Sequence, residues 1–220
     1  YADTPTGEVI FITPHRRSAL FLRKIFSEKV HKAAISPEFI TLDNLLERIS
    51  VIKKMPDLQG LFQLYKVYKE HTESEVDDFE KFVGWGRMLW KDFSDIDQYL
   101  IAYKDIFPYM EAIKEAEHWS VGEELTPMQQ RHLEFWRTLG TYYNAIHKVM
   151  YQQKQGYQGF IARIYYEQID AYRQANKEKL HLFVGFNALS VAQEKIIEYI
   201  LEDMQADIYR DIEKHFLNNQ

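Results

Sequence analysis

Residues 8–26 read EVIFITPHRRSALFLRKIF, and this stretch decides the fold class. It opens with a continuous apolar run rich in β-branched side chains, which is typical of a strand buried on both faces of a parallel sheet. Apolar residues then recur at helical spacing from Leu20 to Phe26. Thr13 offers an N-cap hydroxyl, and Pro14 suits a first helical turn. The segment therefore predicts a strand, a tight turn and a helix.

Two further parts of the chain follow the same pattern. Residues 38–40 predict a short strand, and Thr41 is placed to cap the helix after it. Residues 180–186 read LHLFVGF and predict a second strong strand, with Ser190 as the cap of the next helix. Residues 206–209 predict one more strand. The chain thus returns to α/β organisation towards its carboxyl end.

Between these parts, residues 61–175 show long amphipathic helical patterns and no strand pattern. Thr126 and Pro127 predict the start of a long helix that runs towards Tyr151, and residues 160–175 predict the last helix of the block. The simplest architecture is a helix-rich α/β fold. In it, a parallel sheet with right-handed crossovers is interrupted by an all-helical insertion of roughly a hundred residues.

Composition excludes several classes of protein. A formal net charge of −6 argues against a wholly basic nucleic-acid binder, because neutralising phosphates takes a concentrated patch of Lys and Arg. The chain has no Cys and its 8 His form no i,i+4 pair, so no disulfide and no metal site is predicted. No apolar run approaches the ~18–20 residues of a membrane span, and no basic-then-apolar leader precedes the first strand. We therefore expect a cytoplasmic protein.

The residues that follow the two strongest strands are the candidate binding residues, since ligands of open α/β sheets bind at the carboxyl ends of the strands. After the first strand, His15, Arg16 and Arg17 combine two guanidinium groups with the free backbone N–H groups of a helix start. This combination suits a phosphate oxygen, and Thr13 adds a hydroxyl. A solvated first turn without a ligand is the alternative interpretation.

The second strand tip, residues 185–190, lacks the acidic pair with which an NTPase holds Mg²⁺ and orients water. The chain also lacks a G-x-x-x-x-G-K-[ST] phosphate loop. We therefore expect no ATP hydrolysis by this chain and no cofactor. Asp92, Asp95 and Asp97 fall on different helical faces, so they predict a solvated acidic face rather than a cation site.

Four tryptophans could stack nucleic-acid bases, as aromatic residues do in single-strand binders. Their helical spacing among Phe and Leu favours core positions instead. They are Trp85, Trp90, Trp119 and Trp136. No Ser, His and Asp grouping has the local context of a nucleophile, so no catalytic residue is predicted.

The strand tips together resemble superfamily 1 helicases, and most closely the AddB-type subunit of bacterial helicase-nucleases in its Bacteroidetes form. VIFITPHRRSALFLRKIF resembles the first DNA-contacting motif of that family, and EFITLDNLLERI is similar to the strand and helix that come next. LFVGFNALSVAQEKIIEYI is similar to the Walker B region, a strand that ends in Asp-Glu-Phe. Val184 and Gly185 stand at the two acidic positions, whereas Phe186 and Gln193 are retained. ADIYRD resembles the following strand, with Asp207 or Asp211 as a partial match.

This resemblance implies a partial RecA-like parallel sheet with a large helical insertion. The expected parts are a first α/β part over residues 1–58, an insertion over 59–178, and a return to the α/β domain over 179–220. The chain starts at Tyr1 rather than Met and ends in a polar tail, so we expect a piece of a larger protein. The nuclease domain of the family, of the PD-(D/E)XK type, lies far towards the carboxyl terminus and is absent here.

The implied function is that of an amino-terminal pseudo-helicase fragment of a double-strand-break repair protein. It would bind DNA as a scaffold, without a complete ATPase or nuclease site, beside a helicase-nuclease partner subunit. The expected contacts to the DNA backbone are Thr13, His15, Arg16, Arg17 and Thr41. Two alternatives remain: a protein-docking module whose aromatic helices bind a partner, and an ATPase half whose phosphate loop lies upstream of Tyr1.

Overall fold

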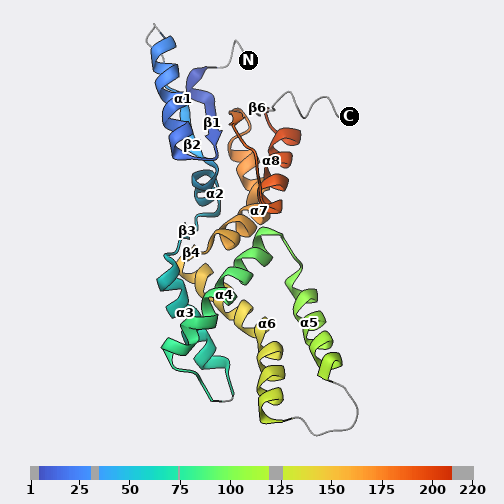
Figure 1. Cartoon of the computed structure of the whole chain (residues 1–220). Helices are drawn as coiled ribbons and strands as arrows, with labels where there is room; N and C mark the ends of the chain where they lie inside the picture. The colour runs from blue at the N-terminus through green and yellow to red at the C-terminus, as the bar shows by residue number, and fades with distance from the viewer. Residues whose placement is uncertain (1–4, 31–34, 74, 119–125, 210–220) are drawn as a thin grey trace, which may run out of the picture. The chain divides into compact units, whose positions relative to one another are not determined.

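The computed structural model describes residues 5–30, 35–73, 75–118 and 126–209 (Figure 1). The chain divides into two compact units. Unit 1 consists of Tyr1–Val51 and Ile164–Gln220, and unit 2 consists of Ile52–Arg163. Within the described residues, none of the helices combines the length and the apolar character needed to cross a membrane.

Unit 1 contains a four-stranded sheet in which every neighbouring pair is parallel. Its strands are β1 (Val9–Thr13), β2 (Glu38–Thr41), β5 (Leu180–Val184) and β6 (Ala206–Tyr209). The spatial order is β2-β1-β5-β6, so the chain first adds a strand on one side of β1 and later adds two on the other. The predicted helix-rich α/β fold with a parallel sheet is confirmed, and the β1/β5 boundary is its topological switch point.

The helices of unit 1 begin largely where the sequence predicts. They are α1 (Arg16–Lys29), α2 (Leu42–Ser50) and α8 (Val191–Asp203), and a short 3-10 turn (Thr6–Glu8) precedes β1. Helix α7 (Gln158–Ala175) belongs to unit 1 from Ile164 onward. Thr41 caps α2 by accepting a hydrogen bond from the Asn44 backbone N–H. Ser190 and Gln193 form a complete capping box at the start of α8. Both caps are confirmed.

The predicted N-cap role of Thr13 is wrong. His15 is the N-cap of α1, and its side chain makes no capping hydrogen bond. Thr13 still belongs to β1, where it pairs with Thr41 of β2, and its side chain is fully buried. Its hydroxyl lies 3.1 Å from the carbonyl oxygen of His15 and 3.3 Å from that of Ile40, so it donates within the sheet edge instead.

The core of unit 1 lies between the sheet and its helices, as parallel strands buried on both faces require. Its fully buried side chains include Ile12, Leu45, Leu46, Phe183, Ile196 and Ile200. The second half of α7 belongs to this unit because Tyr172 bonds the buried His181 of β5. The division after residues 51 and 163 therefore differs from the one expected from the sequence, after residues 58 and 178.

Unit 2 is helical. It contains α3 (Asp57–His71), α4 (Phe79–Gln98), α5 (Tyr103–His118), α6 (Pro127–Gln153) and the first part of α7. Its core is aromatic, with Phe82, Phe93, Tyr142, Tyr143 and Phe160 fully buried. Trp90 is a core residue as predicted, at 6% exposed, whereas Trp85 and Trp136 are half-buried. Trp119 and Asp211 lie outside the described residues.

A small parallel sheet also lies in unit 2, where the sequence predicts no strand. β3 (Lys53–Lys54) pairs with β4 (Gln155–Gly156). The Lys53 N–H donates to the Lys154 carbonyl at 2.9 Å, and the Met55 N–H donates to the Gly156 carbonyl at 2.8 Å. Strands of two residues are too short to show an alternating pattern, which is why sequence periodicity misses them.

Candidate functional site

The sheet of unit 1 brings the two predicted binding segments to one edge. β1 and β5 are neighbours, with Ile12 paired to Phe183, so the residues after Thr13 and after Val184 leave the sheet side by side. This is the carboxyl edge at the switch point, where open α/β sheets bind ligands. The structure thus gathers the two segments, which lie far apart in the sequence.

The start of α1 gives this edge its positive charge. His15, Arg16 and Arg17 are all exposed, and the first turn of α1 contains no acidic residue. Neither arginine makes an ion pair with any residue in the described part of the chain. The first N–H groups of a helix have no partner inside that helix and carry partial positive charge. The edge can therefore offer two guanidinium groups and backbone donors to an anion.

Thr13 and Thr41 occupy a different position from the arginines. Thr13 is 0% exposed and Thr41 is 7% exposed. The Thr41 hydroxyl donates to Asn44 Oδ1 at 2.9 Å while it accepts from the Asn44 N–H. Both hydroxyls are therefore engaged inside the protein, where they fix the strand ends from which α1 and α2 depart. In this conformation neither threonine faces solvent.

The tip of β5 forms a turn rather than a cation site. Gly185 is exposed with φ +79°, a left-handed conformation that favours glycine. Phe186 is buried at 4% exposed and packs on Phe183 with ring centroids 6.1 Å apart. The Gln193 side chain accepts from the Ser190 N–H at 3.0 Å. Phe186 and Gln193 thus hold the turn and cap α8, and Val184 ends the strand half-buried.

The carboxyl edge is unevenly charged. Its predicted residues supply cations and backbone donors, and the segment after β5 supplies Asn187 and Ser190 but no carboxylate. The helix that follows β2 differs, because Asp43 places an acidic side chain in the first turn of α2. The positive charge is therefore concentrated at the α1 side of the edge.

A second polar cluster lies inside unit 2, and sequence reasoning missed it. Asp97, near the end of α4, is 0% exposed, so the predicted solvated acidic face is wrong for this residue. Its carboxylate accepts from the Tyr143 hydroxyl and from Arg163 Nε, and its other oxygen lies 2.9 Å from His147 Nε2. The Arg163 guanidinium also donates to the carbonyl oxygens of Ile96 and Ile101.

The physical chemistry of this Asp97 cluster is that of a structural clamp. Burial, followed by the negative charge of Asp97, raises the pKa of the Tyr143 hydroxyl, and burial raises the pKa of Tyr157 well above its usual range. Both phenols therefore stay protonated and available as donors. The cluster joins α4, α6 and α7, because Asp97, His147 and Arg163 come from these three helices.

A close helix approach supports the same clamp. The Ser94 Oγ accepts from the Gly159 N–H at 3.1 Å. A Cβ at Gly159 would lie 2.0 Å from the Ser94 carbonyl oxygen, so only glycine allows α4 and α7 this separation. One sequence signal could have revealed the cluster: Tyr143 and His147 share a helical face with the apolar Ile146 and Met150.

Among the described residues, no group of three or more His, Asp or Glu side chains is arranged to hold a metal ion. No protein-family model matches the chain, and a search of curated proteins gives no match.

Proposed function

We propose that this chain is the amino-terminal pseudo-helicase part of an AddB-type helicase-nuclease and acts there as a DNA-binding scaffold. The observation that carries the proposal is the pair Arg16 and Arg17, exposed and without ion pairs at the start of α1. They lie at the carboxyl edge beside the β5 tip, which supplies no carboxylate. The edge is thus equipped to hold phosphate and not to activate water.

The order of the elements also supports the proposal. The elements follow the same order as in the motor domains that the sequence resembles. A strand and a basic helix start come first, then a second strand and helix, a helical unit, and a strand tip at the sheet centre. Phosphate contacts position a protein on nucleic acid without reading its sequence. We therefore expect the chain to bind single-stranded DNA without strong sequence preference.

The test is fluorescence anisotropy of labelled single-stranded DNA titrated with the whole chain at about 0.05 M and about 0.2 M salt. We compare the native chain with Arg16→Ala/Arg17→Ala. Loss of two phosphate contacts should weaken DNA binding about tenfold. It should also reduce the magnitude of the slope of log K against log salt by roughly 1.4. If Arg16 and Arg17 contact phosphates, the affinity and the salt dependence should both decrease in the variant.

The matched control is Lys29→Ala/Lys177→Ala. It removes the same formal charge from exposed residues at the end of α1 and after α7, away from the carboxyl edge. Its affinity for DNA should stay close to native. Equal losses in the two double variants would assign binding to net charge alone, and absence of binding at the lower salt concentration would refute the DNA-scaffold function.

A further inference from the structure

The outward face of α1 carries two large apolar side chains, although the outward face of a surface helix is normally polar. Leu20 is 62% exposed and Phe21 is 65% exposed. The face of α1 that packs towards the sheet is formed by other apolar residues, which are buried or half-buried: Ala19, Leu22, Ile25 and Phe26. Leu20 and Phe21 thus contribute little to the core of unit 1, and the fold does not account for their apolar character.

Most of the Phe21 ring is open to solvent, whereas the other rings around α1 are engaged inside unit 1. Phe26 meets Phe39 of β2 edge-on, with ring centroids 6.0 Å apart, and Phe39 stacks on Phe11 of β1 at 5.0 Å. Within the described residues, no second aromatic ring contacts Phe21. A π face of Phe21 is therefore available to an aromatic ligand.

Positive charge flanks this ring. Arg17 lies one helical turn before Phe21 and Lys24 about one turn after it, so the three side chains share one face of α1. Arg17 makes no ion pair with any part of the chain that the structure describes, and Lys24 makes only an exposed pair with Glu28 at 3.8 Å. Helix α1 has five basic residues and one acidic residue in all. A ligand that covers the Phe21 ring would thus meet cations on both sides.

We propose that Phe21 stacks on an unpaired base of the DNA strand whose phosphate Arg17 binds. This inference rests on the proposed DNA-scaffold function and adds to it a physical reason for preferring single strands. Side chains one helical turn apart have Cβ atoms about 5–6 Å from each other, so the base and the phosphate of one nucleotide can reach both residues. Stacking tolerates any sequence, because every base has a π face. A base inside a duplex is already paired and stacked, and its release costs free energy.

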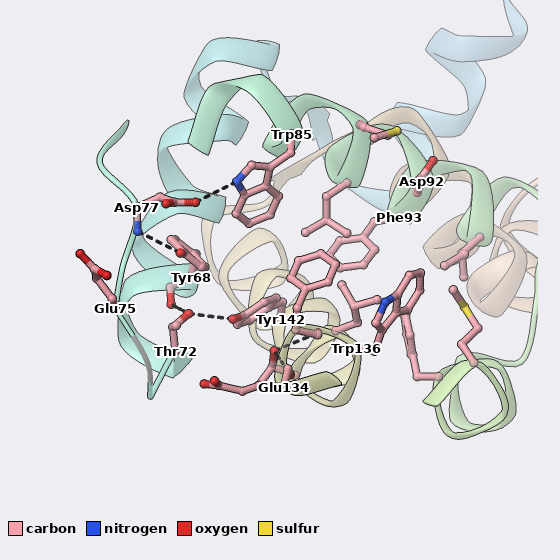
Figure 2. A pocket seen from close by; sticks show the side chains of 18 residues that line it. Tyr68, Thr72, Glu75, Asp77, Trp85, Asp92, Phe93, Glu134, Trp136 and Tyr142 are labelled. Carbon is pink, nitrogen blue, oxygen red and sulfur yellow. Dashed lines mark hydrogen bonds between the residues drawn. The ribbon is translucent and has the colours of Figure 1, made fainter. Parts of the chain in front are cut away.

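Unit 2 offers a second place where a base could meet aromatic side chains. Trp85 and Trp136 line a cavity of about 630 Å³ between α4, α5 and α6 (Figure 2). Both tryptophans are half-buried, and the Trp85 ring packs edge-on against Tyr68 and Phe82. Their ring faces are less free than that of Phe21, which favours α1 as the stacking site.

The test uses anisotropy titrations of a labelled single strand of about 20 nucleotides, which is longer than a typical single-strand site, and of the same strand in a duplex. The whole native chain should bind the single strand more tightly than the duplex. Phe21→Leu keeps an apolar side chain and removes the π face, so it should weaken single-strand binding about tenfold. Its affinity for the duplex should stay within about twofold of native, because a paired base offers no free face.

The salt dependence separates stacking from charge. Titrations at about 0.05 M and about 0.2 M salt should give the same slope of log K against log salt for Phe21→Leu and the native chain, since Phe21 carries no charge. Arg16→Ala/Arg17→Ala should lower the magnitude of that slope. A lower slope in Phe21→Leu would mean that the substitution acts through the arginines, and it would overturn the stacking contact.

Two further variants complete the comparison. Tyr109→Leu is the matched control, because Tyr109 of α5 is 66% exposed and belongs to unit 2. Its affinity for both probes should stay native. Phe21→Trp keeps an aromatic face and should retain single-strand binding. The added indole should lose emission when the single strand binds, measured against the native chain with its four tryptophans in unit 2.

The outcomes distinguish the stacking contact from the DNA-scaffold function. If the native chain binds no DNA at the lower salt concentration, both proposals fail. Native single-strand affinity of Phe21→Leu, or an equal loss for the single strand and the duplex, would overturn the stacking contact alone. A change in the emission of the native tryptophans, together with native affinity of Phe21→Leu, would place the base in the cavity of unit 2 instead. Circular dichroism of each variant shows that a loss of binding is not a loss of fold.

Discussion

The carboxyl edge of unit 1 and the Asp97 cluster of unit 2 both place arginine among polar groups, yet they differ in burial and pairing. Arg16 and Arg17 are exposed and have no ion pair in the described structure. Arg163 has a side chain only 13% exposed, and it bonds a carboxylate and two backbone carbonyls. An arginine already satisfied by its own protein holds the fold. An arginine left open to solvent is available to a ligand.

The largest expected effect tests the buried side of this comparison. In Asp97→Asn, the Arg163 charge stays buried without its carboxylate, and the free energy of unfolding should fall by about 3–5 kcal/mol. Urea denaturation followed by tryptophan fluorescence measures this loss in unit 2, because all four tryptophans lie in residues 52–163. DNA binding by the folded variant should stay native.

The control for this variant is Asp95→Asn on the same helix. Asp95 pairs with Lys91 at 3.9 Å, and both side chains are substantially exposed. Exposed pairs contribute ~1 kcal/mol or less. A loss in Asp97→Asn as small as in Asp95→Asn would contradict the clamp assigned to the Asp97 cluster.

Two glycines of unit 2 sharpen the clamp prediction. A methyl group at Gly159 meets the Ser94 backbone, whereas one at Gly84 meets nothing within 4 Å. Gly159→Ala should therefore separate α4 from α7 and lower the free energy of unfolding by about 1–3 kcal/mol or more. Gly84→Ala should raise it by about 0.5–1 kcal/mol, since alanine is the better helix former. The same urea denaturation measures both; equal effects would mean that the close approach is not required.

His181 gives unit 1 a buried ionisable group of its own. It is 0% exposed, its Nδ1 lies 3.1 Å from the Lys179 carbonyl, and its Nε2 lies 2.6 Å from the Tyr172 hydroxyl. The carbonyl only accepts, so Nδ1 carries the proton and Nε2 accepts from Tyr172 in the neutral ring. Burial accordingly lowers the pKa of His181 below its ordinary value of 6.5.

This shift makes unit 1 sensitive to acid. Below about pH 6.5 the unfolded chain binds a proton at His181 that the folded chain does not, so stability falls as the pH falls. The contribution has a slope of at most about 1.4 kcal/mol per pH unit. Urea denaturation followed by far-UV circular dichroism at several pH values should show a shallower dependence in His181→Gln. An unchanged dependence would mean that the group titrates equally in both states.

The smallest expected effect tests the exposed side of the comparison. Arg16→Ala/Arg17→Ala should change the free energy of unfolding by no more than about 0.5 kcal/mol, because both side chains are exposed. Any change should be stabilising, since cations at a helix start oppose its dipole. Thermal denaturation measures it. A large loss of stability would show that the arginines hold the fold.

Sequence patterns predict most of unit 1. The strands β1 and β5 can be recognised from their continuous apolar runs, because a strand buried on both faces needs such a run. The Ser190 capping box likewise marks the start of α8. The place of Arg16 and Arg17 at the start of α1, next to the carboxyl end of β1, is also predicted from the sequence, whereas their role as a binding site stays a prediction.

The sequence is less informative about unit 2. Asp97 stands among Asp92 and Asp95, and nothing in this local pattern separates a buried carboxylate from two more exposed ones. Its partners Tyr143 and Arg163 lie on other helices, so their convergence depends on how those helices pack. Unit 2 also contains a cavity whose lining comes from separate helices, so the sequence hides it for the same reason.

The turn at Gly185 bears on how the chain can evolve. Any residue with a Cβ placed there would have to adopt the left-handed conformation, at a cost of order 1–3 kcal/mol for a non-glycine residue. A glycine codon is one base change from an aspartate or glutamate codon, but the protein product of that change would be strained. The left-handed turn therefore resists the gain of a carboxylate at this position by a single mutation.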